Sequence, residues 1–304
     1  MRILVTGGAG FIGSHLAAAF LEAGHTVFVI DNLSTGLKEN VPSGADLVEG
    51  DITDRSLLAA LFAEQRIDVV SHHAAQMNIR LSVADPVLDA RVNIMGTLEL
   101  LRQSVVIGVR KFMFSSTGGA VYGEQIKFPA DEEHPTNPVS PYGVSKLAGE
   151  KYIHYYGREY GLPHFIMRYA NVYGPRQNPL GEAGVVAIFS SLLIKGKQVT
   201  INGDGRQTRD YIYVADVVAA NLAGLATDSN MTINVGTGVE TDVVTLYEHL
   251  RQAGGSDLSP RHGPAKPGEQ SRSVISPRRA KELLAWEPRI ELEEGLRRTY
   301  QSFA

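Results

Sequence analysis

The sequence predicts an α/β fold, in which a doubly wound parallel sheet of the Rossmann type is joined to a smaller C-terminal lobe. Three observations predict it. Short apolar runs alternate with longer segments of helical period in the first half of the chain, which is the βαβ pattern of a parallel sheet. A glycine-rich turn follows the first run. After Tyr169, glycine- and proline-rich segments interleave with short helices and strands, as expected of a loop-rich lobe.

The strands of the first domain are expected where short apolar runs stand between helical segments. These runs are residues 3–5, 26–30, 47–49, 69–72, 111–114 and 164–168. Residues 214–226 have the pattern of an amphipathic helix, and residues 232–235 that of a strand. The chain is therefore expected to return to its first domain before it finishes in the second.

Two domains are expected from this division, and a chain of 304 residues is long enough for both. The first is predicted to span residues 1–170, with the return at residues 208–236. The second lobe is predicted to comprise residues 171–207 and 237–304.

Composition argues against several classes of protein. The chain has 43% hydrophobic residues, no cysteine and a formal net charge of −4, so it needs no disulfides and is not attracted to polyanions. Its longest nearly apolar stretch, residues 185–194, is too short to span a bilayer, and the chain opens on a strand without a signal peptide. We expect a cytoplasmic protein with neither nucleic acid nor a membrane as partner.

The glycine-rich turn, Gly7-Gly-Ala-Gly-Phe-Ile-Gly13, follows a strand and opens a helix. Glycines at positions 7, 10 and 13 let backbone N–H groups and the helix N-terminus approach a pyrophosphate. Asp31 ends the second strand, where a carboxylate accepts hydrogen bonds from ribose hydroxyls and repels a 2′-phosphate. A tight turn without a ligand is the alternative, but the turn and the acid together favour NAD over NADP as a cofactor.

Asp51 follows the third strand, within Gly50-Asp-Ile52. Its carboxylate could hold the adenine amino group, or it could be the N-cap of the next helix. Both interpretations are open at this point.

A Tyr-x-x-x-Lys pair, Tyr142 and Lys146, lies where a helix is expected to begin after a proline-rich loop. Such pairs also arise by chance, so the spacing alone is weak evidence. At the start of a helix, however, the two side chains lie one turn apart on one face. The lysine charge is then expected to lower the phenol pKa from about 10, helped by a cationic nicotinamide, so that a tyrosinate could act as a base.

His72 and His73 invite the hypothesis of a metal site. Adjacent strand residues point to opposite faces of a sheet, and no further ligands lie at useful spacing in the sequence. We therefore expect no metal.

Several ordered motifs resemble those of the extended short-chain dehydrogenase/reductases. They are the glycine-rich turn, the segment from Ser115-Ser-Thr117 to Val121-Tyr-Gly123, Ser140-Pro-Tyr-Gly-Val-Ser-Lys146 and Asn171-Val-Tyr-Gly-Pro175. The segments 181–189 and 208–212 are similar to those of the UDP-glucose (UDP-galactose) 4-epimerases within that family. The resemblance covers essentially the whole chain.

The resemblance implies catalytic and cofactor-binding roles for individual residues. Tyr142 matches the base, Lys146 the residue that binds the nicotinamide ribose, and Thr117 the residue that hydrogen-bonds the reacting hydroxyl, with Ser116 as the alternative. The cofactor residues implied are Gly7, Gly10, Phe11, Ile12, Gly13, Asp31, Asn32, Ser34, Thr35, Gly36, Asp51, Ile52, Ala74, Ala75, Gln76, Asn93, Ser115, Tyr142, Lys146 and Tyr169. Asn93 could instead cap a helix, and Gln76 could be a solvated loop residue.

For a UDP-sugar substrate, the resemblance implies binding residues in the second, substrate lobe and beside the catalytic hydroxyl. They are Thr117, Asn171, Val186, Arg209, Lys266, Glu269 and Ser273. Arg209 matches a cation for the diphosphate, with a surface ion pair to Asp210 as its alternative. Val186 is expected to border the uracil, and Ser273 the sugar 2-substituent, unless Arg272 occupies that space.

The implied reaction is NAD-dependent epimerisation of a UDP-hexose at C4, through a 4-keto intermediate. A UDP-uronic acid 4-epimerase is the nearest alternative. A nucleotide-sugar 4,6-dehydratase fits less well, because Gly118 and Gly119 follow the hydroxyl residue where dehydratases carry an acid. A catalytically silent NAD-sensing protein is the alternative from another class. The resemblance also implies a homodimer, formed through the helices around residues 86–104 and 142–160.

Overall fold

The computed structural model describes residues 1–179, 184–265 and 270–304. Within these ranges the main sheet has seven parallel strands in the order β11-β6-β5-β4-β1-β2-β3. The strands are β1 (Arg2–Thr6), β2 (Thr26–Asp31), β3 (Asp46–Glu49), β4 (Val69–His72), β5 (Lys111–Thr117), β6 (His164–Tyr169) and β11 (Met231–Val235). The predicted doubly wound α/β sheet is confirmed, and all the strands expected from the sequence are present.

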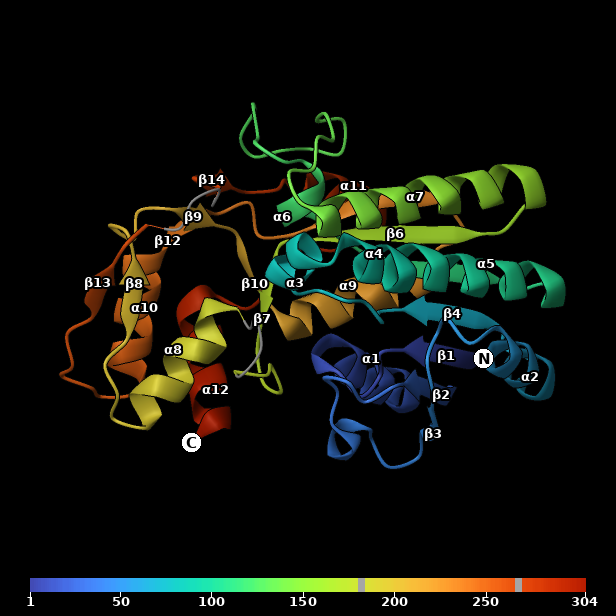
Figure 1. Cartoon of the computed structure of the whole chain (residues 1–304), viewed down its shortest axis with the longest axis horizontal. Helices are drawn as coiled ribbons and strands as arrows, with labels where there is room; N and C mark the ends of the chain where they lie inside the picture. Colours follow the sequence, from blue (N-terminus) through green and yellow to red (C-terminus); the bar gives the residue numbers. More distant parts are fainter. Residues whose placement is uncertain (180–183, 266–269) are drawn as a thin grey trace.

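Alternation along the strands explains why both faces of the sheet are covered. Ile3 and Val5 belong to one core cluster, whereas Leu4 between them belongs to another, because successive strand residues point to opposite faces. Helices therefore pack on each side (Figure 1). One side carries α1 (Phe11–Glu22), α9 (Val214–Ala226) and α11 (Arg278–Leu284); the other carries α2 (Arg55–Gln65), α3 (Ile79–Ala84), α4 (Pro86–Ala90), the π-helical turn η2 (Arg91–Met95), α5 (Gly96–Ile107) and α7 (Pro141–Tyr160).

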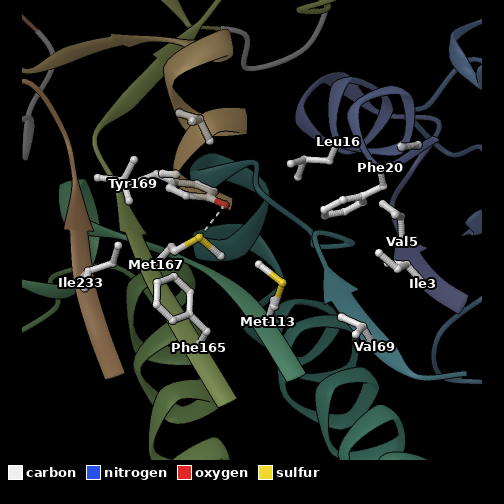
Figure 2. Packing of buried hydrophobic residues seen from close by; sticks show 14 of the residues in the cluster. Ile3, Val5, Leu16, Phe20, Val69, Met113, Phe165, Met167, Tyr169 and Ile233 are labelled. Atoms are coloured by element: carbon white, nitrogen blue, oxygen red, sulfur yellow. Dashed lines mark hydrogen bonds between the residues drawn. The ribbon is translucent and has the colours of Figure 1, made fainter. Parts of the chain in front are cut away.

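The first of these clusters is shown from close by in Figure 2, where Leu16 and Phe20 of α1 approach Ile3, Val5 and Val69. All of these side chains are at most 1% exposed. Fully burying each is worth about 1.5–3 kcal/mol, so this helix is held against the sheet mainly by its apolar face.

Residues 208–236, where the sequence predicts a return of the chain, contribute strands to more than one sheet. β11 pairs with β6, and α9 packs against α1. Thr208 and Arg209, by contrast, form β9, which pairs with β12 (Thr241–Asp242) and β14 (Arg272–Ser273). The domain boundaries proposed from the sequence stay a prediction.

The C-terminal lobe has its own core, next to the main sheet (Figure 1). Its helices are α8 (Val185–Ile194), α10 (Val243–Ala253) and α12 (Leu292–Phe303), and its short strands are β8 (Thr200–Asn202), which pairs with β13 (Arg261–Gly263), and the β12-β9-β14 sheet. The parallel pair β7 (Asn171–Tyr173) and β10 (Tyr211–Tyr213) also contributes tyrosines to this core. The remaining short helices are η1 (Lys38–Asn40) and α6 (Gly118–Val121).

Candidate active site

The glycine-rich turn lies between the carboxyl end of β1 and the first turn of α1. Gly7 has a φ of +70°, and a side chain there would meet the backbone of Ala74 at 2.7 Å. A Cβ on Gly13 would lie 2.2 Å from the carbonyl oxygen of Gly7. Gly10 is the N-cap of α1 and offers no side-chain cap, so the first N–H groups of the helix stay available to an anion. This geometry fits a pyrophosphate.

Asp31 lies at the carboxyl end of β2, directly beside the glycine-rich turn. Its Oδ2 accepts a hydrogen bond from the N–H of Ala9 at 3.0 Å, and its Oδ1 accepts one from Leu33 at 2.9 Å. The carboxylate is therefore fixed beside the glycine-rich turn. Each oxygen retains a further lone pair for a ribose hydroxyl.

The loop after β2 folds back onto the same turn. Leu37 donates its N–H to the carbonyl oxygen of Ala9, and a Cβ on Gly36 would meet the backbone of Ala9 at 2.9 Å. Ser34 donates its N–H to the side chain of Asn32. Ser34 and Thr35 lie in this loop at or near the surface. Asp31 and Gly36 thus both lie against the backbone of Ala9.

Asp51 does not cap the helix that follows it, so that interpretation is wrong. Asp54 is the N-cap of α2, with its carboxylate accepting from the N–H groups of Ser56 and Leu57, since an N-cap must directly precede the first helical turn. Asp51 instead accepts from Asn32 Nδ2 at 2.9 Å and from Thr53.

Burial acts to raise the pKa of Asp51, but the hydrogen bonds from Thr53 and Asn32 leave it below its ordinary value. The carboxylate stays an acceptor beside the Asn32 loop. Ile52 is 5% exposed and packs in the core under α5. The adenine role of Asp51 stays a prediction.

The loop after β4 is held by Asn93. Gln76 donates its N–H to Asn93 Oδ1 at 2.9 Å, and Asn93 Nδ2 donates back to the carbonyl oxygen of Gln76 at 2.8 Å. Asn93 lies inside the η2 turn and is 3% exposed, so the capping alternative is wrong. Gln76 is partly buried and also bonds Asp89, which makes it a fixed residue of the loop. Ala74 of this loop lies beside Gly7, and Ala75 follows it in the chain.

His72 and His73 point in opposite directions from the end of β4. The His72 ring lies 2.7 Å from the Thr6 hydroxyl and 2.9 Å from that of Thr97. The His73 ring lies 3.2 Å from the Tyr169 hydroxyl. Burial lowers the pKa of both rings, that of His73 to about 3, so both are neutral near pH 7. They act as hydrogen-bonding residues of the core.

Tyr142 and Lys146 lie in the first two turns of α7, as the sequence predicts. The helix begins at Pro141 because the hydroxyl of Ser140 accepts the N–H of Gly143 as N-cap and proline favours the first helical position. Lys146 is 3% exposed, and its ammonium donates to the carbonyl oxygen of Ser115 at 2.9 Å. This contact places the lysine at the carboxyl end of β5.

The pKa of Tyr142 shifts in the direction opposite to our expectation. Burial raises the pKa of the phenol, and the carboxylate of Asp89 raises it further. Burial also lowers the pKa of Lys146 to about 8, against the opposing influence of Asp89 and Glu150. A tyrosinate near neutral pH would need the positive charge of the nicotinamide as well.

The two candidate hydroxyls at the end of β5 have different surroundings. Ser116 is 3% exposed and donates to Glu150 Oε1 at 2.5 Å. Thr117 is partly exposed, and the structure shows no hydrogen bond from its hydroxyl to any described residue. A Cβ on Gly119 would lie 3.8 Å from that hydroxyl and 3.4 Å from Asn171 Oδ1. Thr117 and Asn171 therefore border one space, and the geometry favours Thr117 over Ser116.

Tyr169 is directed into the core. It is 5% exposed, accepts a hydrogen bond from Asn221 Nδ2 at 2.8 Å, and donates toward the sulfur of Met167 (Figure 2). Burial raises the pKa of its phenol. With its hydroxyl held in this way, the cofactor contact proposed for Tyr169 is left to its backbone and ring.

Arg209 and Ser273 are register partners in the parallel pair β9 and β14. The alternative of a surface ion pair for Arg209 does not fit, because Asp210 is 2% exposed and its carboxylate accepts from Thr237 and Gly238. Arg209 donates to the carbonyl oxygen of Thr208 at 2.8 Å.

Ser273 is 3% exposed. Its neighbour Arg272 turns the other way, because it forms an ion pair with Glu240 at 2.7 Å and lies 3.8 Å above the ring of Phe128. The alternative in which Arg272 occupies the space beside Ser273 therefore does not fit.

The remaining substrate residues have mixed outcomes. Val186 lies in the first turn of α8 and is 1% exposed within the core of the lobe. Lys266 and Glu269 lie outside the described residues.

Sequence reasoning missed three buried charged residues behind the site: Asp89, Glu150 and Arg168. Each is at most 6% exposed. Glu150 and Arg168 form a two-point ion pair between α7 and β6, at 2.9 and 2.6 Å. The sequence did contain a signal for the pair of Glu150 and Arg168: a glutamate one helical turn after Lys146 and an arginine within an apolar strand. Charged residues on buried faces are usually paired, so these two could have been predicted to be partners.

Comparisons with known proteins agree with this geometry. A profile of the NAD dependent epimerase/dehydratase family matches residues 3–236. A putative UDP-glucose 4-epimerase of Methanocaldococcus jannaschii is 45% identical over 97% of this chain and 96% of its own.

Two solved structures are also similar. UDP-glucose 4-epimerase from Thermotoga maritima, crystallised with UDP-glucose, has a TM-score of 0.98 and 48% identity over 100% of this chain and 98% of its own. That of Thermus thermophilus, in complex with NAD, has a TM-score of 0.95 and 44% identity over 100% and 99%. Among the residues that the structure describes, no helix is long and apolar enough to cross a membrane.

Proposed function

Because this chain belongs to the NAD-dependent epimerase/dehydratase family, we propose that it is a UDP-hexose 4-epimerase that interconverts UDP-glucose and UDP-galactose with tightly bound NAD. The observation that carries the proposal is the arrangement at the end of β5. Tyr142 and Lys146 lie one turn apart on α7, with the ammonium of Lys146 bonded to Ser115. Thr117, two residues further on, presents a hydroxyl that is not tied to Glu150, unlike that of Ser116.

NAD, held by the glycine-rich turn and Asp31, would supply the acceptor and the donor of the hydride exchanged at C4 of the sugar. The protein's part is proton transfer and positioning. Tyr142 removes the proton of the C4 hydroxyl, while Thr117 hydrogen-bonds the same oxygen and orients it. The 4-keto sugar then turns over within the site, and Tyr142 returns the proton. Since net redox is zero, the cofactor has no need to leave between turnovers.

The glycine-rich turn and Asp31 are proposed to hold the cofactor at its pyrophosphate and adenosine ribose. Asn171 and Arg209 are proposed to hold the substrate diphosphate, because a pair of phosphates in a partly enclosed site needs a fixed cation. Asn171 supports this role by its position beside Thr117.

The alternatives differ in the chemistry that comes after the first oxidation. A dehydratase needs an acid next to the hydroxyl residue, and α6 begins there with Gly118 and Gly119. A UDP-uronic acid 4-epimerase would need a partner for the substrate carboxylate. A catalytically silent sensor of NAD has no need of a lysine buried against Ser115.

A direct test incubates the purified protein with UDP-glucose, UDP-galactose, their N-acetylated forms and UDP-glucuronic acid, and follows the C4 configuration by NMR. We expect interconversion of the two hexoses and NAD(H) released on denaturation. Turnover of the uronic acid alone would support the first alternative. Loss of water across C5–C6, which leaves a 4-keto-6-deoxy sugar, would support the dehydratase. Bound NAD without any turnover would support the sensor.

Asp31→Ala is expected to weaken the preference for NAD over NADP by at least about 10-fold, because it removes a carboxylate that a 2′-phosphate would oppose. Asp31→Asn is the matched control: it keeps an acceptor for the N–H of Ala9 but loses the charge. Dissociation constants for both cofactors measure the effect. If both variants kept the parent's preference for NAD over NADP, Asp31 would not be the residue that sets this preference.

Ser273→Tyr is expected to suppress the reaction of UDP-N-acetylgalactosamine selectively, by about 10-fold or more in kcat/KM, because overfilling a packed site costs about 1–3 kcal/mol. In the parent we expect both plain and N-acetylated sugars to react, since Arg272 is held by Glu240 and leaves the space to Ser273. Equal losses for both sugars in the variant would contradict the assignment.

A homodimer is proposed through the outer faces of α4, η2 and α7. These faces expose large apolar side chains: Val87 is 77% exposed, Met95 53% and Tyr155 44%. A cytoplasmic location also stays a prediction from the sequence.

A further inference from the structure

Asp89 is a completely buried acid that the proposed mechanism does not use. It lies on the five-residue helix α4 and is 0% exposed. An isolated carboxylate in such a place would be costly, so its partners must be close and well aligned. They come from three different parts of the chain.

The hydrogen bonds of Asp89 join these parts. Its Oδ2 accepts from the hydroxyl of Ser145 on α7 at 2.5 Å. Its Oδ1 accepts from Asn93 Nδ2 on η2 at 3.1 Å and from Gln76 Nε2 in the loop after β4 at 3.2 Å. One carboxylate therefore links the helix that carries Tyr142 and Lys146 to the loop proposed to face the cofactor.

We propose that Asp89 is a positioning residue for the acid–base pair: it aligns the first turns of α7 with the loop after β4, and its negative charge acts on Tyr142 and Lys146. The expected effect on turnover rests on the proposed function. The geometry around Asp89 does not depend on the proposed function.

Electrostatics at the site agree with this role. Burial and then Asp89 raise the pKa of Tyr142, and Asp89, followed by Glu150, opposes the lowering of the Lys146 pKa by burial. His72 and His73 on β4 are neutral near pH 7 because burial lowers the pKa of each.

The other elements packed against α4 contribute exposed charges. Arg80 of α3 and Arg91 of η2 are both exposed, so solvent screens them. Asp89 and Glu150 are thus the carboxylates that act on Lys146.

The sign of the effect is set by the charge of Asp89. Without that negative charge, the phenolate of Tyr142 is repelled less and the ammonium of Lys146 is stabilised less. Both groups should then titrate at lower pH. In Asp89→Asn the phenol should ionise at lower pH than in the parent, and the pH profile of kcat should move in the same direction.

The test titrates the NAD-loaded protein by its absorbance near 295 nm. The signal of Tyr142 is the difference between each protein and the same protein with Tyr142→Phe, which isolates one phenol among 12 tyrosines. We expect a lower midpoint in Asp89→Asn and an unchanged midpoint in Ser145→Ala, which keeps the charge. An Asp89→Asn midpoint equal to or above that of the parent overturns the electrostatic role.

Ser145→Ala tests the positioning role separately and covers the case that Asp89→Asn does not fold. We expect kcat to fall by up to about 10²-fold, as for a misplaced catalytic group, with KM little changed. Parental kcat in Ser145→Ala would overturn the positioning role. Because the phenol titration needs no sugar, a protein that epimerises nothing would still reveal the effect of Asp89, and the two proposals fail independently.

Discussion

Tyr142→Phe is expected to lower kcat for C4 epimerisation by about 10²–10⁴, the usual worth of a placed acid–base group. The variant keeps the ring and loses only the hydroxyl, so the start of α7 and the contact of Lys146 with Ser115 should survive. NAD content after purification should match the parent. Steady-state rates with UDP-galactose and the NAD(H) released on denaturation measure both quantities.

Two variants at the end of β5 serve as controls for this expectation. Thr117→Ala should also slow turnover, because its hydroxyl borders the same space as Asn171. Ser116→Ala should slow it less, since the Ser116 hydroxyl is directed to Glu150. The reverse order would exchange the roles of the two hydroxyls. Full activity in Tyr142→Phe would rule out the phenol as the base.

Arg168→Met is expected to destabilise the fold by about 3–5 kcal/mol, because it leaves the carboxylate of Glu150 buried and uncompensated. Arg168 also donates to the hydroxyl of Tyr122 at 3.0 Å, and that hydroxyl donates in turn to Asn234 of β11 at 2.7 Å. The loss therefore affects the contacts of α7, β6 and β11 together. Chemical denaturation measures the free energy of unfolding, provided that unfolding is reversible.

The chain offers matched controls for this buried pair. Arg278 and Glu282 form an ion pair with 76% and 61% of their side chains exposed, and Arg278→Met should cost no more than about 1 kcal/mol. The double variant Arg168→Met with Glu150→Leu should recover much of the loss, since replacing both ions by apolar groups removes the desolvation cost. If Arg168→Met were as stable as the parent, water or another cation would have to compensate the charge of Glu150.

Much of the fold is determined by patterns local in the sequence. Ile3, Leu4 and Val5 alternate between the two core clusters because the side-chain period of a strand is two, and this period is readable without knowing any partner strand. The start of α7 is equally local: Ser140 caps it and Pro141 comes next. Such local rules placed Tyr142 and Lys146 on one face.

Tertiary structure decided the charge state and the surroundings of these residues. Burial raises the pKa of the Tyr142 phenol, and Asp89, more than 50 residues away in the sequence, raises it further. The roles of Ser116 and Thr117 differ because the Ser116 hydroxyl donates to Glu150. Only the packing of α7 on β5 brings Glu150 to that hydroxyl. Spacing along the chain determined which residues share a face, whereas burial and the approach of distant carboxylates, set by three-dimensional packing, determined their electrostatics.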